Sequence, residues 1–316
     1  MAQLSVVMLT YNRENFLPSS IESVLSQTFG DFEFVLINNG STDGSKEICE
    51  HYAAKDKRIK LINIEENRGA PPGRNQGLLS ATTDYITFVD DDDYCEPGML
   101  ELLKNLSKEY DADISLCGSW NNINGTLVPY FIFDETLVLD KVQGLHELLR
   151  REKYNVAPPT KLFRKSLFDG ITFVENVLVD DIHVTYKLFA KANVIVAYGE
   201  PLYRFNKHDG NMTSFIQNNK ISYDLLNEYL HAFRERTEYL SNVVPEIAPR
   251  AFYSELSYML SVCDKIQSQD NMKVLYDYMI GILEHNYSLL SRSPFLTDRD
   301  NMLLKRLKQN PKNERI

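Results

Sequence analysis

Four consecutive carboxylates, Asp90 to Asp93, directly follow the apolar, β-branched run 85–89. Like charges in a row repel one another, so a folded protein tolerates such a cluster when water solvates it or when it holds a cation. A buried strand ending here carries the acids to the edge of a sheet. This arrangement suits a divalent metal that binds a phosphate-bearing ligand, and the alternative is a solvated acidic turn.

A second acid pair, Asp180 and Asp181, follows the apolar run 177–179 and precedes a segment with helical periodicity, residues 183–191. Two adjacent carboxylates can raise the pKa of one of them towards neutrality, which suits a general base. The alternative is that one of the two acids caps the helix. The two roles are compatible.

The elements that must position these acids alternate between two periodicities. Short apolar runs predict strands over residues 4–10, 32–37, 59–64 and 85–89, and helical spacing predicts helices over 17–26, 45–55 and 74–81. This alternation predicts an α/β fold with a parallel sheet and helices on both faces. Ligands bind at the carboxyl ends of such strands. Polar side chains follow all four strands: Thr10, Tyr11 and Asn12, then Asn38 and Asn39, then Arg68 and Arg74, then Asp90 to Asp93.

The rest of the chain divides at about residue 215. Before it, helices are predicted over 99–110, around 145–149 and over 183–191, and strands over 114–118, within 126–133, and over 194–197 and 201–205. After it, helical spacing continues to about residue 307, with few glycines and prolines. We therefore predict a first domain over residues 1–215 and a helical C-terminal region over 216–316.

Composition narrows the class of protein. The 316 residues are 43% hydrophobic and 25% charged, typical of a globular chain, and the net charge of -10 lacks the basic footprint of nucleic-acid binding. The four cysteines are widely spaced, so a zinc site is not expected and a reducing, cytoplasmic compartment is. The start has no signal-peptide pattern, and no apolar run is long enough to span a membrane.

Several stretches, taken in order, resemble family 2 glycosyltransferases of the GT-A fold. They are Ser5-Val6-Val7-Met8-Leu9-Thr10-Tyr11-Asn12, Asn39-Gly40-Ser41-Thr42-Asp43, Arg74-Asn75-Gln76-Gly77-Leu78, Phe88-Val89-Asp90-Asp91-Asp92-Asp93, Val179-Asp180-Asp181 and Pro201-Leu202-Tyr203-Arg204. The resemblance covers about residues 3–215 and implies a Rossmann-like, mostly parallel sheet with a donor half (1–95) and an acceptor half (96–215). It also implies transfer of a sugar, with inversion, from a nucleoside diphosphate sugar to an acceptor hydroxyl in bacterial cell-surface polysaccharide or glycolipid synthesis.

The resemblance assigns roles to the acids. Asp90 to Asp92 match the family's DXD motif, with Asp92 expected on the metal and Asp90 on the metal or the donor ribose. Oxygen ligands and phosphates suit Mn²⁺ or Mg²⁺ rather than zinc. Asp91 is expected in the same donor site. Asp181 is expected to be the catalytic base, with Asp180 binding the acceptor.

The resemblance also implies a nucleotide site. Thr10, Tyr11 and Asn12 form its nucleobase loop, with the tyrosine ring stacking on the base. Asn39 stands where the family usually has an aspartate that accepts the uracil imide hydrogen; an amide oxygen also accepts, so a UDP-sugar is expected.

Two further residues, Arg74 and His208, complete the expected site. Arg74, expected just inside a helix start, faces the base edge or the diphosphate. His208 lies in a loop expected to close over the diphosphate, where it ligates the metal or bonds a phosphate.

Two other functions and two partners stay open. A sugar-1-phosphate nucleotidyltransferase shares a related sheet but needs a glycine-rich loop after the first strand, and Tyr11 to Glu14 contain no glycine. A non-catalytic nucleotide-sugar-binding module is the third reading. Basic residues near the C-terminus suggest peripheral contact with the inner face of a membrane that carries a lipid-linked acceptor, and the helices before them suggest packing or a homodimer.

Overall fold

The computed structural model describes residues 2–208, 211 and 221–309. The chain forms two compact units, residues 1–208 and 209–316, each considered by itself below. The domain boundary predicted near residue 215 lies outside the described residues. We call the first unit the catalytic unit and the second the helical unit.

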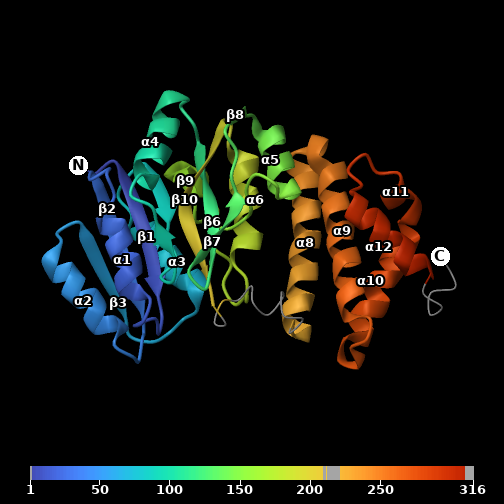
Figure 1. Ribbon diagram of the computed structural model, residues 1–316, viewed down its shortest axis with the longest axis horizontal. Coiled ribbons are helices and arrows are strands. Elements are labelled where there is room, and N and C mark those ends of the chain that lie inside the picture. Colours follow the sequence, from blue (N-terminus) through green and yellow to red (C-terminus); the bar gives the residue numbers. More distant parts are fainter. Residues whose placement is uncertain (1, 209–210, 212–220, 310–316) are drawn as a thin grey trace. The chain divides into compact units, whose positions relative to one another are not determined.

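The first half of the catalytic unit is the predicted parallel sheet. Its strands are β1 (Leu4–Thr10), β2 (Phe32–Asn39), β3 (Ile59–Ile64) and β4 (Tyr85–Phe88), in the order β3-β2-β1-β4. The helices between them are α1 (Leu17–Leu25), α2 (Ser45–Lys55) and α3 (Ala70–Ser80). The alternation read from the sequence is confirmed, so the carboxyl ends of β1, β2, β3 and β4 share one edge (Figure 1).

One helix boundary was predicted wrongly. Helix α3 begins at Ala70, four residues earlier than expected, and Pro71 and Pro72 stand in its first turn. Proline fits there because the first helical N–H groups have no partner within the helix. Arg74 therefore lies more than one turn inside α3. The electrostatic effect of the helix dipole is confined to the first turn and does not extend to Arg74.

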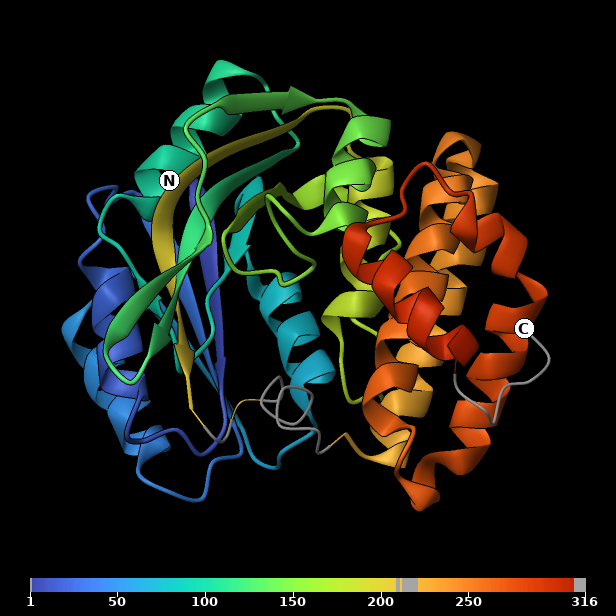
Figure 2. The same ribbon diagram turned by 45° about the vertical axis from the view of Figure 1, so that its right-hand side comes forward.

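Helices cover both faces of this sheet. Side chains such as Val6 and Met8 of β1 share one core with α1 and α2, while Val7 and Leu9 point to the opposite face. There α3 packs against them, to the right of the sheet in Figure 2. Gly73 and Gly77 make this close approach possible, since a Cβ at either position would overlap Leu9 or Val7. Arg74, next to Gly73, is thereby held close to the strand ends.

The second half of the catalytic unit departs further from the prediction. The short strand β9 (Lys161–Arg164) was not predicted, and it lies antiparallel between β4 and β6 (Ile114–Ile123). The two strands predicted near 194–205 are one long strand, β10 (Ile195–Lys207), which pairs with β6. The remaining elements are β5 (Tyr94–Cys95), α4 (Met99–Glu109), β7 (Thr126–Phe131), β8 (Thr136–Leu139), α5 (Lys141–Arg150), the 3₁₀ helix η1 (Lys165–Phe168) and α6 (Asp181–Lys191).

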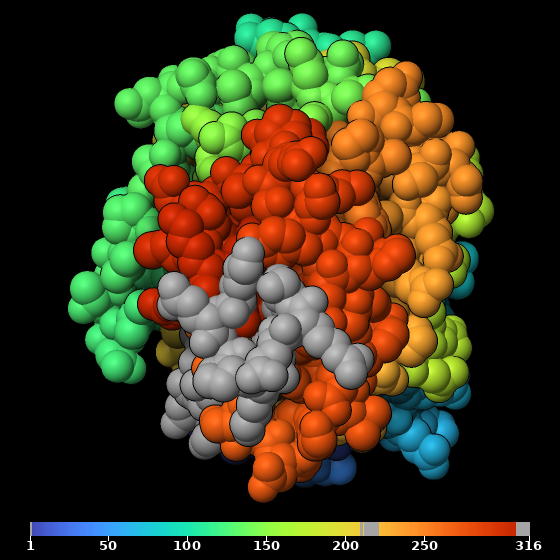
Figure 3. All heavy atoms as spheres, turned by 90° about the vertical axis from the view of Figure 1, so that its right-hand side faces the viewer, coloured from blue at the N-terminus to red at the C-terminus, as the bar shows by residue number. Residues whose placement is uncertain are grey.

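The helical unit contains, among its described residues, the helices predicted from sequence. They are α8 (Tyr223–Val243), η2 (Pro245–Ile247), α9 (Ala248–Ile266), η3 (Asp270–Met272), α10 (Lys273–His285), α11 (Tyr287–Ser291) and α12 (Asp298–Gln309). Apolar side chains such as Leu226, Leu256 and Met279 are buried between them. Figure 3 looks onto this unit, coloured orange to red. In the described parts of both units, no helix is long and apolar enough to cross a membrane.

Candidate functional site

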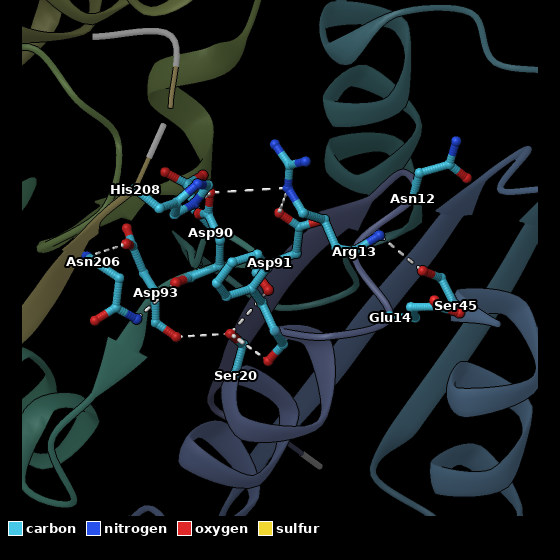
Figure 4. Close-up of polar contacts among 12 residues, drawn as sticks. Asn12, Arg13, Glu14, Ser20, Ser45, Asp90, Asp91, Asp93, Asn206 and His208 are labelled. Atoms are coloured by element: carbon cyan, nitrogen blue, oxygen red, sulfur yellow. Dashed lines mark hydrogen bonds and ion pairs between the residues drawn. The ribbon is translucent and has the colours of Figure 1, made fainter. Parts of the chain in front are cut away.

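The acid turn after β4 is fixed through its backbone and its last carboxylate. The hydroxyl of Ser20, on α1, donates to the carbonyl oxygens of Asp91 (2.9 Å) and Asp93 (2.7 Å). The Asp93 carboxylate accepts from the Tyr203 hydroxyl (2.9 Å) and from the backbone N–H of Asn206 (2.8 Å). Figure 4 shows Ser20 and Asn206 on either side of the turn. Asp93 therefore positions the turn against β10, and its side chain is buried.

Two other acids of the turn, Asp91 and Asp92, face an arginine and a histidine. His208 Nε2 lies 2.9 Å from Asp92 Oδ2, and the ring of His208 stacks on Phe16 at 4.6 Å. Arg13 Nε lies 3.8 Å from Asp91 and 3.9 Å from Asp92, and Figure 4 shows Arg13 beside Asp91. The structure therefore brings the predicted residue His208 to the predicted acids Asp91 and Asp92, although His208 follows Asp92 by 116 residues in the sequence.

Negative charge at the turn is only partly compensated. Burial and the neighbouring Asp92 carboxylate raise the pKa of Asp91 to about 7, against weaker opposing effects from Thr10 and Arg13. Burial also raises the pKa of Asp90, even though the Arg74 guanidinium acts in the opposite direction. Carboxylates that resist ionisation at neutral pH gain from an added cation. The solvated acidic turn considered from the sequence does not match this partly buried arrangement.

The donor atoms at the turn fit a hard divalent cation. Asp92 and His208 offer carboxylate oxygen and imidazole nitrogen side by side, and Mg²⁺ and Mn²⁺ commonly take one or two carboxylates together with substrate phosphates and water. Over residues 2–208, 211 and 221–309, no group of three or more Asp, Glu, His and Cys side chains is arranged so that it could hold a metal ion by itself. A cation at this turn would therefore need further ligands, such as phosphate oxygens or water.

Arg74 joins the two acid clusters predicted from the sequence. Its Nη1 donates to both carboxylate oxygens of Asp180, at 2.5 and 2.6 Å, and its Nη2 donates to Asp90 at 3.0 Å. The Arg74 side chain is 16% exposed and those of Asp180 and Asp90 are 11% and 33% exposed. The acids after β4 and the acids before α6 therefore lie in one site, on either side of a single guanidinium.

Asp181 is the first residue of α6, and its carboxylate has a raised pKa. Burial and the adjacent Asp180 charge raise its pKa to about 6, while Arg74 and Arg151 act in the opposite direction. Within the described structure, its Oδ1 is buried and has no hydrogen-bond partner. Asp180 stands at the N-cap position, but its side chain makes no capping hydrogen bond there and binds Arg74 instead. The capping alternative is therefore wrong for Asp180.

The loop after β1 is tied to the loop after β2. Asn12 lies in the left-handed region at φ 52°. Its side-chain oxygen accepts from the backbone N–H of Thr42 (2.8 Å), and its own backbone N–H donates to Ser41 Oγ (3.1 Å). Tyr11 is 40% exposed, so its ring face is available to a base. Thr10 is buried below Asp91 and lowers the pKa of that acid. Of these three residues, only Tyr11 offers a free stacking surface.

The two asparagines that end β2 have structural partners. Asn39 is 2% exposed; its amide donates to Asn67 Oδ1 and to the Gly69 carbonyl, both at 3.0 Å, and its oxygen accepts from the Arg68 N–H at 3.4 Å. Asn39 thus holds residues 67–69, which lead into α3. The Asn38 oxygen accepts from the Ser41 N–H at 3.2 Å and so holds the turn after β2. Recognition of a base edge by Asn39 must compete with these bonds.

Sequence reasoning missed three residues that shape the site. Ser20, Tyr203 and Asn206 fix the acid turn but carry no charge pattern that would single them out. Tyr203 lies in the quoted stretch Pro201–Arg204, which was matched without a role. The apolar residues around Tyr203 predict only a buried strand residue. The arrangement of the strands in the sheet is needed to place its hydroxyl beside Asp93.

Comparison with known proteins finds glycosyltransferases. Residues 5–172 match the family described as Glycosyl transferase family 2. Glycosyltransferase GlyG of Streptococcus pneumoniae is 30% identical over 217 residues, covering 66% of this chain and 72% of GlyG. Poly(ribitol-phosphate) beta-glucosyltransferase of Bacillus spizizenii is 32% identical over 215 residues, covering 66% of this chain but 33% of that protein.

Solved structures support the fold. TarS residues 1–349 of S. aureus, in complex with UDP-GlcNAc, superimposes with a TM-score of 0.73 and 22% identity, over 95% of this chain and 83% of that one. Mannosyltransferase PcManGT from Pyrobaculum calidifontis, in complex with GDP-Man and Mn²⁺, gives 0.53 and 14%, over 97% and 86%. With the sheet order and the converging acid clusters, the match over residues 5–172 shows that this chain is a GT-A-fold glycosyltransferase belonging to glycosyltransferase family 2.

Proposed function

We propose that the chain transfers a sugar, with inversion, from a nucleoside diphosphate sugar to an acceptor hydroxyl, and that the reaction depends on a divalent cation. The observation that carries the proposal is the position of Arg74 between Asp90 and Asp180. It makes one site of a donor-side acid turn and an acceptor-side acid pair. Family membership rules against a sugar-1-phosphate nucleotidyltransferase, since that activity belongs to a different class of enzyme.

On the donor side, the exposed ring of Tyr11 stacks on the nucleobase, and Arg13 and Arg74 lie where they can meet the diphosphate. Asp92 and His208 would hold the cation, with Asp90 as a further ligand or as a partner of the donor ribose. A bound Mn²⁺ or Mg²⁺ stabilises the charge that grows on the leaving diphosphate. A cation at this turn would weaken the repulsion between the Asp91 and Asp92 carboxylates, and this supports placing the cation there.

On the acceptor side, Asp181 removes the proton of the attacking hydroxyl. The raised pKa of about 6 leaves this carboxylate ionised at neutral pH while keeping it a better base than an ordinary aspartate. Asp180, turned towards Arg74, is placed beside the base to orient the acceptor. A single base opposite the leaving group gives inversion, because attack and departure occur on opposite faces of the sugar.

The donor is proposed to be a UDP-sugar and the acceptor a cell-surface polysaccharide or glycolipid. The TarS complex contains UDP-GlcNAc, and the Bacillus spizizenii relative is named for a poly(ribitol-phosphate) acceptor. Membrane contact through the basic C-terminal residues, cytoplasmic placement and a homodimer stay predictions. Lys312 and Arg315, part of that basic segment, lie outside the described residues.

Thermal unfolding in the presence of UDP, GDP, CDP and TDP, with and without Mn²⁺, tests donor binding, because a ligand that binds the folded state raises its stability. We expect the largest rise with UDP and Mn²⁺ together. Donor hydrolysis or transfer is then compared between the wild type and Asp181→Asn. Loss of turnover with retained donor binding supports the base assignment, equal turnover refutes it, and binding without turnover in the wild type indicates a non-catalytic module.

A further inference from the structure

Asn75, the residue after Arg74 on α3, binds the backbone of the segment that leads into α6. Its side-chain nitrogen donates to the Phe173 carbonyl at 2.9 Å, and the Phe173 N–H donates to its side-chain oxygen at 2.8 Å. Residues 169–180, to which Phe173 belongs, form neither helix nor strand. A single side-chain amide therefore satisfies both backbone polar groups of Phe173, as a neighbouring strand does for a residue in a sheet.

The ring of Phe173 packs beside the strand that ends at the acid turn. Phe173 is 1% exposed, and its ring meets the ring of Phe88 edge-on, with 5.4 Å between the centroids. Phe88 is the last residue of β4 and precedes Asp90 by two residues. The guanidinium carbon of Arg74 lies 5.8 Å from the centroid of the Phe173 ring. The hydrogen bonds of Asn75 therefore hold a buried ring that contacts both the end of β4 and Arg74.

Helix α3 holds the same segment at a second point. Asp180, seven residues after Phe173, accepts from Arg74 at 2.5 and 2.6 Å. Arg74 and Asn75 are consecutive, so one turn of α3 fixes both ends of this stretch of the segment. Asp181 directly follows the second attachment and begins α6. Since α3 packs closely against β1, that turn of α3 is a fixed support for the residues that lead to Asp181.

We propose that Asn75 is a positioning residue of the transfer reaction, whose amide holds the segment before α6 so that Asp181 reaches the acceptor hydroxyl. This inference rests on the proposed role of Asp181 as the base. A base must lie about 3 Å from the proton-bearing atom, and a misplacement of about 1 Å can cost about a hundredfold in rate. Arg74 alone fixes the segment at one point. The second attachment, at Phe173, also fixes the direction in which the chain enters α6.

Two variants on adjacent residues of α3 separate this role from a general effect on the helix. Asn75→Leu removes both hydrogen bonds to Phe173 and keeps the branched shape of the side chain. Gln76→Leu is the matched control, because Gln76 is exposed and its amide donates to Ser80 Oγ on the same helix at 3.3 Å. Mn²⁺-dependent hydrolysis of UDP-Glc, UDP-Gal, UDP-GlcNAc and UDP-GalNAc gives kcat and KM, and calorimetry gives the Kd of UDP with Mn²⁺.

We expect Asn75→Leu to lower kcat by about tenfold to a hundredfold and to change the Kd of UDP by less than about twofold. The acid turn and Tyr11 do not depend on Asn75, because Ser20 and β10 hold the turn. Gln76→Leu should keep both values. A merely structural role lowers stability without this split between turnover and binding. A folded Asn75→Leu protein with wild-type kcat, or with equal losses of turnover and UDP binding, overturns the proposal.

Hydrogen exchange measured by mass spectrometry tests the attachment without turnover. Because the Phe173 N–H donates to Asn75, the amides of residues 171–180 should exchange about tenfold faster in Asn75→Leu than in the wild type or Gln76→Leu. Unchanged exchange refutes the attachment. Faster exchange, in a protein whose wild type hydrolyses none of the four UDP-sugars, counts against the proposed function and leaves the attachment intact.

Asn75→Asp provides a second variant in case Asn75→Leu does not fold. It keeps the shape of the side chain and the acceptor for the Phe173 N–H, and it loses only the donor to the Phe173 carbonyl. We expect its kcat to fall in the same direction as that of Asn75→Leu, with UDP binding retained. Wild-type kcat in Asn75→Asp, together with faster exchange of residues 171–180, overturns the proposal.

Discussion

Replacing Arg74 with methionine removes the only guanidinium that contacts both Asp90 and Asp180 among the described residues. The three N–O distances of 2.5, 2.6 and 3.0 Å show that both carboxylates depend on it. Removing one partner of a buried ion pair costs about 3–5 kcal/mol because it leaves a charge uncompensated. The Asp90 side chain is 33% exposed, so water takes over part of the lost contact. We therefore expect Arg74→Met to lower the free energy of unfolding by about 2–3 kcal/mol at pH 8.

The decrease in the free energy of unfolding of Arg74→Met should depend on pH, and the pKa of Asp90 sets the direction. The pKa of Asp90 is already raised by burial with Arg74 present, and it rises further when the positive charge is removed. The folded variant then binds more protons than the unfolded chain over the range between the ordinary aspartate pKa and the raised one. Stability of the variant therefore falls as pH increases through that range. At pH 5 we expect the destabilisation to shrink to about 1 kcal/mol.

Urea unfolding followed by tryptophan fluorescence measures this directly. Trp120 is the only tryptophan of the chain and lies on β6, so its emission reports on the catalytic unit. Arg68→Met is the control, because Arg68 is an exposed arginine in the loop that precedes α3 and should change stability by less than about 0.5 kcal/mol. Equal destabilisation of Arg74→Met at pH 5 and pH 8, or none at pH 8, would refute the reasoning.

Three further predictions follow from the site. The kcat/KM of the wild type should fall about tenfold per pH unit below the Asp181 pKa of about 6, and a limb near pH 4 would show that another group is the base. Asn39→Asp removes the amide donor to Asn67 and Gly69 and should destabilise the catalytic unit by about 1–3 kcal/mol in urea unfolding; unchanged stability would show that this amide is dispensable. His208→Ala should raise the Mn²⁺ concentration needed for calorimetrically measured donor binding by about tenfold or more, whereas an unchanged requirement would exclude His208 from the metal site.

The fold of the donor half was predictable because it is built from elements that are consecutive in the sequence. Each strand and the helix after it follow one another in the sequence, and parallel order then places Asn12, Asn39 and Asp90 at one edge without knowledge of any long-range contact. Charge clustering marked both acid groups for the same reason. The start of α3 was missed because Pro71 and Pro72 suggest a break, although proline is tolerated in a first helical turn.

The acceptor half was less predictable because its contacts are non-local. Strand β9 pairs with β4 and β6, which lie far before it in the sequence, and its four residues carry no clear alternation. Lys161, on this strand, is fully buried, which its charge alone would not predict. The hydrogen bond of Tyr203 to Asp93 spans 110 residues. Such a contact depends on where a strand ends in space, which periodicity does not specify.

Each acid of the site is compensated in a different way, and the differences explain where a cation belongs. Asp93 accepts hydrogen bonds from Tyr203 and Asn206, although burial still raises its pKa well above the usual range, and Asp180 is paired with Arg74. Asp91 faces Arg13 only at 3.8 Å, and its pKa is raised to about 7.

The middle of the turn, beside the Asp92–His208 pair, therefore holds a carboxylate, Asp91, without a close cationic partner, whereas Asp93 is buried and Asp180 is paired with Arg74. A divalent cation bound there reduces the repulsion that raises the pKa of Asp91. It also leaves Arg74 between the two acid groups. The proposed donor diphosphate, which needs positive charge, then has the divalent cation. The proposed acceptor base, which must stay ionised, has Arg74 nearby. The two groups can therefore occupy one site without sharing the same positive charge.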